Sequence, residues 1–450
     1  MMNIDKIITT PILLVFLIIC AGSFQAFAQD EKNSQVYSVD DCIRMALNNN
    51  WSVKSKEEKI DEAVYVKKQA ESDFFPTIST SYGYTRLSEV RRSKAIPLGP
   101  GAVIPASDLN SQGNFQWSAT VSQPIFTGFA LTSAHELAKL GIDQSVIALE
   151  LEKLDLALSV KNVYFNILKA DKGVDVAEKA IKSLASHVEV ARNFYDVGMI
   201  PVNDLLKAEV ELSNAQHNLV KVLNASQFSR ASLNMLLSKP INESFDIEDM
   251  LVFKNENSDF GSYLARALEK RPEIKALELN IIQVEHQVKL ARSKYFPQIA
   301  LSYNYVKEGN DITASGSGFH DANSWQAMAG LSWTIWDWNK TDNSVSEKKS
   351  LKRQLIQTRK AIEDGIRLEL KKAFLDLEET EKNIPTSKKA VSQAEENLRV
   401  SQERYKAQVT TSTEVLDAQT LLSQARTNYY NALYDHKLAK AALLRSIGEY

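Results

Sequence analysis

The second half of this chain repeats the first half, and this duplication limits the possible folds more than any other feature. Residues 46–84 align with residues 267–305 at a constant offset of 221 and share 14 of 39 positions. Further along, at an offset of 210, three residues recur in order: Tyr195, Leu206 and Ala208 as Tyr405, Leu416 and Ala418. A fixed period of this kind indicates one structural unit built twice. We assign the repeats to residues 29–238 and 261–450, with a polar connector over 239–260.

Each repeat has the same order of predicted elements. A helix, over 50–74 or 271–295, ends at Pro76 or Pro297, because the residue before a proline disfavours helix and favours an extended chain. Two strands, a very long helix, a short turn and a final helix follow. The first repeat places these strands and helices at 76–86, 115–126, 130–196 and 203–236. The second repeat places them at 297–306, 325–337, 339–407 and 413–446.

The predicted helices have the length and apolar spacing of a coiled coil. At 1.5 Å per residue each long helix would reach about 100 Å, which exceeds the size of a globular domain. Apolar residues in the final helices alternate at spacings of three and four, as in a heptad seam: Leu205, Ala208, Leu212 and Ala215, then Val415, Ala418, Leu422 and Ala425. Gly173 and Pro385 lie at related points of the long helices, where we expect a kink or short break at 171–173 and 383–385.

The predicted strands carry large apolar side chains at alternate positions. Their aromatic members are Tyr82, Tyr84, Trp117, Tyr303, Tyr305 and Trp333. Strands of about 9–11 residues with one apolar face and one small polar face are typical of a membrane barrel, so we expect these aromatics to face lipid. Amphipathic strands on a soluble core are the alternative, but four strands among so many helical residues offer little core to cover.

Four strands are too few to close a barrel, which needs about eight. Strand edges left unpaired in lipid would be costly, because their backbone groups find no partner there. After residue 28 no apolar stretch approaches the length of a membrane-spanning helix. We therefore expect several copies of the chain to pool their strands, and three copies would supply twelve.

The N-terminus has the pattern of a secretory signal peptide over residues 1–28. Lys6 precedes the apolar run 11–20, and Ala26-Phe27-Ala28 matches a signal-peptidase site. An uncleaved anchor and a lipid attached at Cys20 are the alternatives. Cleavage would leave Cys42 as the only cysteine, so no disulfide within the chain is expected.

Composition and motifs argue against enzymes and nucleic-acid-binding proteins. The formal net charge is -3, whereas nucleic-acid binding usually needs a strongly basic face. The six histidines are scattered without metal-ligand spacing, and no glycine-rich phosphate loop follows a strand. We expect no catalytic residues, no metal and no cofactor.

The two turns between the long and final helices carry the most specific polar residues. Gly198 suits a left-handed helix end, and Asn203 and the run 411–413 are natural N-caps. Asp204, Glu414 and Asp417 fall in a first turn, where the helix dipole favours acids. Stabilising the start of a helix would by itself be enough to explain all three acids.

The mature chain resembles the TolC-type outer-membrane factors of Gram-negative bacteria. The resemblance rests on the Phe-Pro pairs before the strands, on Gln123-Pro-Ile-Phe-Thr-Gly128, on the turn with Val415-Leu416-Asp417-Ala418, and on the duplicated layout. It implies a mainly α fold with a small β part: a periplasmic α-barrel of helical hairpins and a shared twelve-stranded β-barrel in the outer membrane. It also implies a homotrimer surrounded by outer-membrane lipid, a periplasmic adaptor protein, and an inner-membrane pump or secretion ATPase.

The same resemblance gives roles to residues at the periplasmic tip. Glu414 and Asp417 would line the pore, and Tyr405 with Asp204 would help hold the tip shut. Thr410 stands where an arginine of the closing network is usual, and Gln408 where a glycine is usual, so the closing mechanism is left open. The expected function is a passive efflux conduit driven by a partner pump. A protein-secretion conduit of the same family and a periplasmic coiled-coil structural or adaptor protein are the alternatives.

Overall fold

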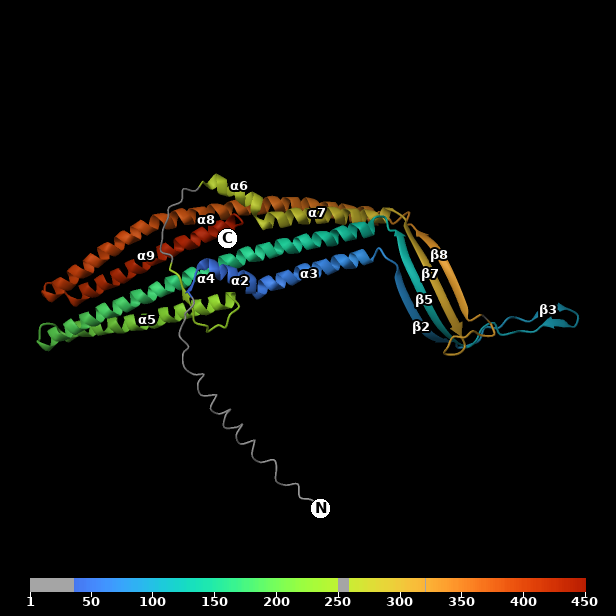
Figure 1. Cartoon of the computed structure of the whole chain (residues 1–450), viewed down its shortest axis with the longest axis horizontal. Coiled ribbons are helices and arrows are strands. Elements are labelled where there is room, and N and C mark those ends of the chain that lie inside the picture. Colours follow the sequence, from blue (N-terminus) through green and yellow to red (C-terminus); the bar gives the residue numbers. More distant parts are fainter. Residues whose placement is uncertain (1–35, 250–258, 320) are drawn as a thin grey trace, which may run out of the picture.

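The computed structural model describes residues 36–249, 259–319 and 321–450. The predicted signal peptide, with Cys20, and part of the predicted connector lie outside these ranges. The described part is long and narrow, with helical hairpins at one end and a small sheet at the other (Figure 1). Within these ranges no helix is both long and apolar enough to cross a membrane.

Both repeats contain two helices, two sheet strands, a long helix and a final helix in the same order, and they differ in a small hairpin and a 3-10 turn. The first comprises α2 (Val39–Asn49), α3 (Trp51–Ser72), β2 (Thr77–Arg86), a small hairpin of β3 (Ile96–Gly99) and β4 (Ala102–Ile104), β5 (Gly113–Phe126), α4 (Ala130–Asp196) and α5 (Val202–Leu236). The second comprises α6 (Phe260–Lys270), α7 (Pro272–Arg292), the 3-10 turn Ser293–Tyr295, β7 (Gln298–Gly309), β8 (Asn323–Ser332), α8 (Lys340–Lys406) and α9 (Ser412–Ser446). A short parallel pair, β1 (Val36–Tyr37) with β6 (Asp246–Ile247), lies at mid-length.

The duplication extends to single hydrogen bonds. Asn50 and Arg271 are equivalent at the offset of 221, and each separates a short helix from a longer one. Their backbone N–H groups donate to the carbonyls of Ala46 and Ala267, which are both fully buried. The side chains differ: the Asn50 amide donates to the Leu236 carbonyl at 2.8 Å, whereas Arg271 carries an ion-pair network.

The elements form an open ribbon rather than a closed bundle. Toward the sheet the packing order of the helices is α3, α4, α7, α8, and toward the tip it is α5, α4, α9, α8. The sheet has the order β2, β5, β7, β8, with all neighbours antiparallel. At the tip, at the helices next to the sheet and in the sheet itself, one free edge therefore belongs to the first repeat and the other to the second.

The strand register joins the apolar side chains of all four strands into one face. Across β2 and β5, Tyr82 is opposite Trp117, and across β7 and β8, Tyr305 is opposite Trp325. Directly opposed residues in antiparallel strands point to the same side of the sheet. The other face carries small polar residues, such as Ser81 opposite Ser118 and Thr120 opposite Asn304. The sheet therefore has the two unlike faces that the alternation predicts.

The long helices are continuous at the two places where a kink or short break was expected. α4 runs through Gly173 and α8 runs through Pro385, although proline removes a helical hydrogen bond. Contacts with the adjacent helix keep the chain helical at both sites. Asp171 accepts hydrogen bonds from Ser226 and Arg230 of α5, and Ile384 is buried in a cluster with Ala432 and Leu433 of α9, so the neighbouring helices outweigh the local preference.

The last predicted strand ends earlier than expected. β8 stops at Ser332, which pairs with Gln298, the first residue of β7. Before Gln298 stands Pro297, which has no N–H group to extend the ladder. Trp333 is therefore outside the strand, and its indole N–H donates to the Tyr295 carbonyl at 3.1 Å.

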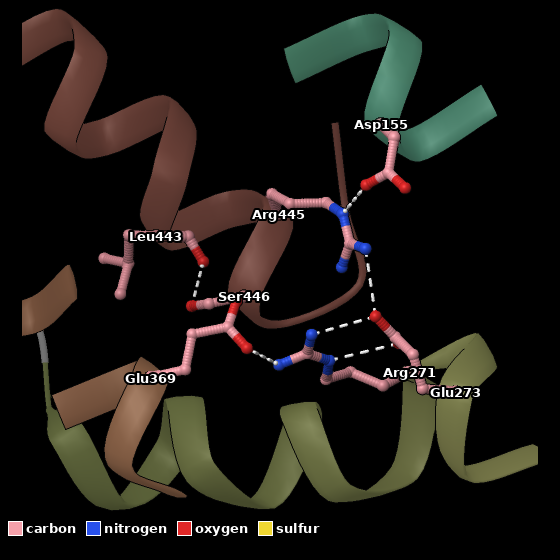
Figure 2. Close-up of polar contacts among 7 residues, drawn as sticks. All are labelled: Asp155, Arg271, Glu273, Glu369, Leu443, Arg445 and Ser446. Carbon is pink, nitrogen blue, oxygen red and sulfur yellow. Dashed lines mark hydrogen bonds and ion pairs between the residues drawn. The ribbon is translucent and has the colours of Figure 1, made fainter. Parts of the chain in front are cut away.

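A partly buried ion-pair network ties the repeats together at mid-length (Figure 2). Arg271 is 4% exposed and donates twice to Glu273 on α7 and once, at 2.8 Å, to Glu369 on α8. Arg445, at the end of α9, donates to Glu273 at 2.9 Å and to Asp155 on α4 at 2.6 Å. Although burial opposes it, hydrogen bonding from Arg271 holds the pKa of Glu273 at about 2. Four helices from both repeats thus meet at one cluster of charges.

Candidate functional site at the helical tip

Two turns, one from each repeat, form the tip farthest from the sheet (Figure 1). Gly198, between α4 and α5, and Gln408, between α8 and α9, both have left-handed backbones, with φ of 77° and 58°. Glycine takes this conformation freely, whereas another residue pays about 1–2 kcal/mol. The Gln408 amide donates to Sδ of Met199 at 2.9 Å, so this residue links the two turns.

Of the two N-caps predicted at the tip, Asn203 is wrong, and the run 411–413 supplies the N-cap position without a side-chain hydrogen bond. α5 begins behind Pro201, so Asn203 lies inside the first turn, and Thr411 is the N-cap residue of α9 but makes no side-chain cap bond. The next residue, Ser412, is fully buried and its hydroxyl lies 2.8 Å from Nε2 of His187 on α4. The Ser412 hydroxyl thus joins α9 to α4 of the other hairpin, and neither helix start has a side-chain cap.

Glu414 and Asp417 lie three residues apart on α9, but their surroundings differ. The Glu414 carboxylate accepts a hydrogen bond from Arg404 at 2.9 Å and another from the Thr410 hydroxyl. Asp417 is exposed and makes no ion pair within the described ranges. It lines a groove between α9 and α5, together with Lys207. Thr410, at the position usually held by arginine, thus contacts a tip acid of its own hairpin.

Tyr405 and Asp204, the two other predicted closing residues, lie close to each other. The Tyr405 ring is buried between His187, 4.9 Å away, and Phe194, 5.6 Å away, both on α4. Burial, followed by the negative charge of Asp204, raises the pKa of Tyr405. Burial also lowers the pKa of His187 to about 4. The two hairpins of one chain are therefore packed through a neutral aromatic cluster.

The six aromatic residues predicted to face lipid lie on the sheet or at its end, at the opposite end of the molecule from the tip. Tyr84 packs on Phe115 with ring centroids 4.5 Å apart, and Trp117 packs on Tyr305 at 5.9 Å. Tyr303 stacks on Trp325 at 6.0 Å. The hydroxyl of Tyr82 donates to the Ile312 carbonyl in the β7–β8 loop. Five of the six share the apolar face, and Trp333 lies just beyond it.

Known proteins share both the duplication and the fold. The chain matches the family described as Outer membrane efflux protein over residues 42–238 and 263–449, once for each repeat. It belongs to this family. Outer membrane protein TolC of Escherichia coli K12 is 21% identical over 459 residues, covering 97% of this chain and 86% of that protein.

Solved structures of outer-membrane channels have the same fold. The outer-membrane channel OprN gives a TM-score of 0.75 at 15% identity, covering 92% of this chain and 90% of that one. The CmeC outer membrane channel of Campylobacter jejuni gives 0.75 at 16% identity, covering 91% and 85%. This outer membrane efflux protein is therefore an outer-membrane channel with a long periplasmic helical part. Its family consists of transport proteins and not of enzymes.

Proposed function

We propose that three copies of this chain close side by side into one passive tunnel across the outer membrane and the periplasm. The observation that carries the proposal is the arrangement of free edges. At every level the ribbon ends in a first-repeat element on one side, namely β2, α3 or α5, and in β8 or α8 on the other. A head-to-tail contact between unlike edges produces a ring when the rotation closes.

The free edges carry apolar side chains that a lone chain leaves in water. Phe228 on α5 is 75% exposed and Leu368 on α8 is 74% exposed. The heptad seam shows the same asymmetry, because Ala425 and Leu422 on α9 are buried, whereas the equivalent Ala215 and Leu212 on α5 are only half-buried. α9 has a helix on each side and α5 has one, so α5 needs a neighbour from another chain.

The strand directions also allow closure. Neighbours alternate in direction from β2 to β8, so β8 of one copy and β2 of the next would be antiparallel. Three copies give an even-numbered antiparallel barrel, as is usual in bacterial outer membranes. The apolar face would then meet lipid and the small polar face would line the lumen.

The tunnel would conduct cargo without chemistry of its own. We propose that a periplasmic adaptor contacts the tip and that an inner-membrane pump supplies the driving force. Asp417, exposed and unpaired in the described residues, would act on passing ions at the tip more strongly than Glu414, which Arg404 partly neutralises.

Native mass measurement combined with planar-bilayer recording tests this proposal. Protein extracted from outer membranes is expected to have the mass of three chains and to conduct ions when reconstituted. A species with the mass of one chain, or a trimer that never conducts, would contradict it.

A further inference from the structure

A pocket of about 430 Å³ lies where the sheet meets the helices, between the start of α4 and the end of α7. Its walls include Phe129 and Phe296, and three charged side chains: Glu136, Lys289 and Arg292. The tip site lies at the other end of α4, so this pocket belongs to a different part of the molecule (Figure 1).

The rim of the pocket continues the apolar face of the sheet. Phe126 is opposite Ile299 in the register and therefore belongs to that face. The rings of Phe126, Phe129 and Phe296 pack edge to face, with centroid separations of 5.4, 5.7 and 6.4 Å. An apolar path thus leads from the pocket onto the sheet.

Phe129 lies at the rim of the pocket in an unfavourable backbone conformation. Phe129 has a φ of 70° and is 58% exposed, which combines a strained backbone with a large ring left in solvent. The preceding Gly128 has a φ of 64°, and a Cβ there would lie 2.3 Å from the Ser293 carbonyl oxygen. This turn is therefore packed closely on the 3-10 turn that follows α7, and position 128 requires glycine.

The charges in the pocket have no partners among themselves. Lys289 and Arg292 make no ion pair in the part of the chain that the structure describes, and the nearest basic atom to Glu136 is Nδ1 of His135 at 3.9 Å. Two cations and one carboxylate thus line one pocket without neutralising one another. A ligand with a negative and a positive group would match them.

The start of α4 adds partial positive charge that no residue of its own offsets. The first-turn N–H of Leu131 is bound by the neutral hydroxyl of Thr127 at 3.3 Å. At the equivalent position of the second repeat stands Asp337, whose carboxylate accepts from the N–H of Thr341 at 2.9 Å. The helix dipole is therefore matched by an anion at α8 but not at α4, where an external anion is favoured.

We propose that this pocket binds the headgroup of a zwitterionic, amine-bearing phospholipid from the periplasmic leaflet of the outer membrane. The phosphodiester would lie against Lys289, Arg292 and the start of α4, and the ammonium group would donate to Glu136. An acyl chain would follow Phe129 onto the apolar face. The inference rests on the proposed function in taking that face as the one in contact with lipid.

Native mass spectrometry of the detergent-solubilised assembly tests the site with three lipids of identical chains: dioleoyl phosphatidylethanolamine, phosphatidylcholine and phosphatidylglycerol. We expect the ethanolamine lipid to saturate at one copy per chain. The double variant Lys289→Gln/Arg292→Gln should weaken its binding tenfold or more. Glu136→Gln should reduce it to the level of the choline lipid, whose quaternary ammonium has no N–H to donate.

Lys340→Gln is the matched control, because it removes a lysine near the sheet at the helix start already held by Asp337, and it should leave binding unchanged. Equal binding of all three lipids, tighter binding of the glycerol lipid, or unchanged binding in both variants would overturn the inference. The native mass of the protein, measured before lipid is added, shows whether the trimer forms independently of lipid binding. A trimer without the specific lipid therefore contradicts only this inference, and a monomer contradicts the proposed function.

Discussion

Glu414 and Asp417 have the same formal charge, but the structure predicts unequal effects on ion passage. Arg404 and Thr410 already bind Glu414, whereas Asp417 stands exposed. Asp417→Asn should lower the preference of the channel for cations, and Glu414→Gln should lower it less. Reversal potentials in a salt gradient measure this preference. Glu209→Gln, which removes an acid already paired with Arg192, is the control.

The competing explanation is that the two tip acids only stabilise the start of α9. In that case replacing both by Ala would leave selectivity unchanged and lower stability, by about 0.3–1 kcal/mol for Glu414 in the first turn and by less for Asp417, which lies beyond that turn. Unchanged reversal potentials in the double variant would therefore contradict the pore-lining role.

His187 should make the tip sensitive to acid. In the folded chain its pKa is about 4, and in the unfolded chain it returns to about 6.5. Between these values the unfolded state binds more protons, so the free energy of unfolding should fall as the pH is lowered, by about 3 kcal/mol in total. His187→Gln cannot titrate and should flatten the dependence. Melting temperatures at pH 7, 5 and 4 measure it, and identical slopes in both proteins would refute the prediction.

The tip shows which residues a sequence can and cannot assign. The acids were predictable because they lie in a duplicated turn beside a helix start. His187 was not, because its partner Ser412 is 225 residues away and a single histidine on a long helix has no pattern. Asn203 was misassigned because Pro201 already occupies the N-cap position and the helix begins at Val202.

At the scale of elements, the network around Arg271 should be the most sensitive point of the junction between repeats. Arg271→Gln would leave Glu273 and Glu369 without their main partner, at a cost of about 2–4 kcal/mol because the cluster is only partly open to water. Asn50→Ala changes the equivalent residue of the first repeat, where a hydrogen bond and a cap are lost, at about 1–2 kcal/mol.

Thermal unfolding followed by circular dichroism orders these variants. The exposed pair of Arg399 and Glu396 is the control, since solvent screens it and Arg399→Gln should change stability least. The predicted order of destabilisation is Arg271, then Asn50, then Arg399. A melting temperature for Arg271→Gln as high as that of Arg399→Gln would contradict a structural role for the network.

The order and type of the long helices and of the four sheet strands followed from the repeat, the heptad spacing and the strand alternation. The short helices α2 and α6, the β3–β4 hairpin and the ends of the elements did not. Local preference placed breaks near Gly173 and Pro385, and contacts with α5 and α9 override them. The alternation of side chains predicted that the last strand extends past Ser332. The register with β7 shows that Ser332 already pairs with the first residue of β7, so no partner remains for a longer strand. Such contacts join distant segments and leave no local pattern.

At the scale of the whole molecule, the chain is an open ribbon. Along its whole length one free edge is formed by the first repeat and the other by the second. The need for several copies could be argued from four amphipathic strands alone. Which edges meet could not, because it depends on the packing order of helices and strands that are far apart in the sequence. The structure identifies β2 and β8 as the two outer strands of the sheet, which the proposed trimer would join.

Disulfide cross-linking between these edges tests the central claim most directly. Ser81→Cys in β2 is combined in turn with Met328→Cys, Gly330→Cys or Ser332→Cys in β8, all on the polar face, with Cys42 replaced by Ser. A Cβ added at Gly330 would meet no atom within 4 Å, so a side chain can be introduced there freely. On oxidation in outer membranes, at least one combination should give covalent dimers and trimers and nothing larger, whereas Ser81→Cys alone should give no trimer. Failure of all three combinations, or a ladder extending beyond three chains, would contradict closure of three ribbons into one channel.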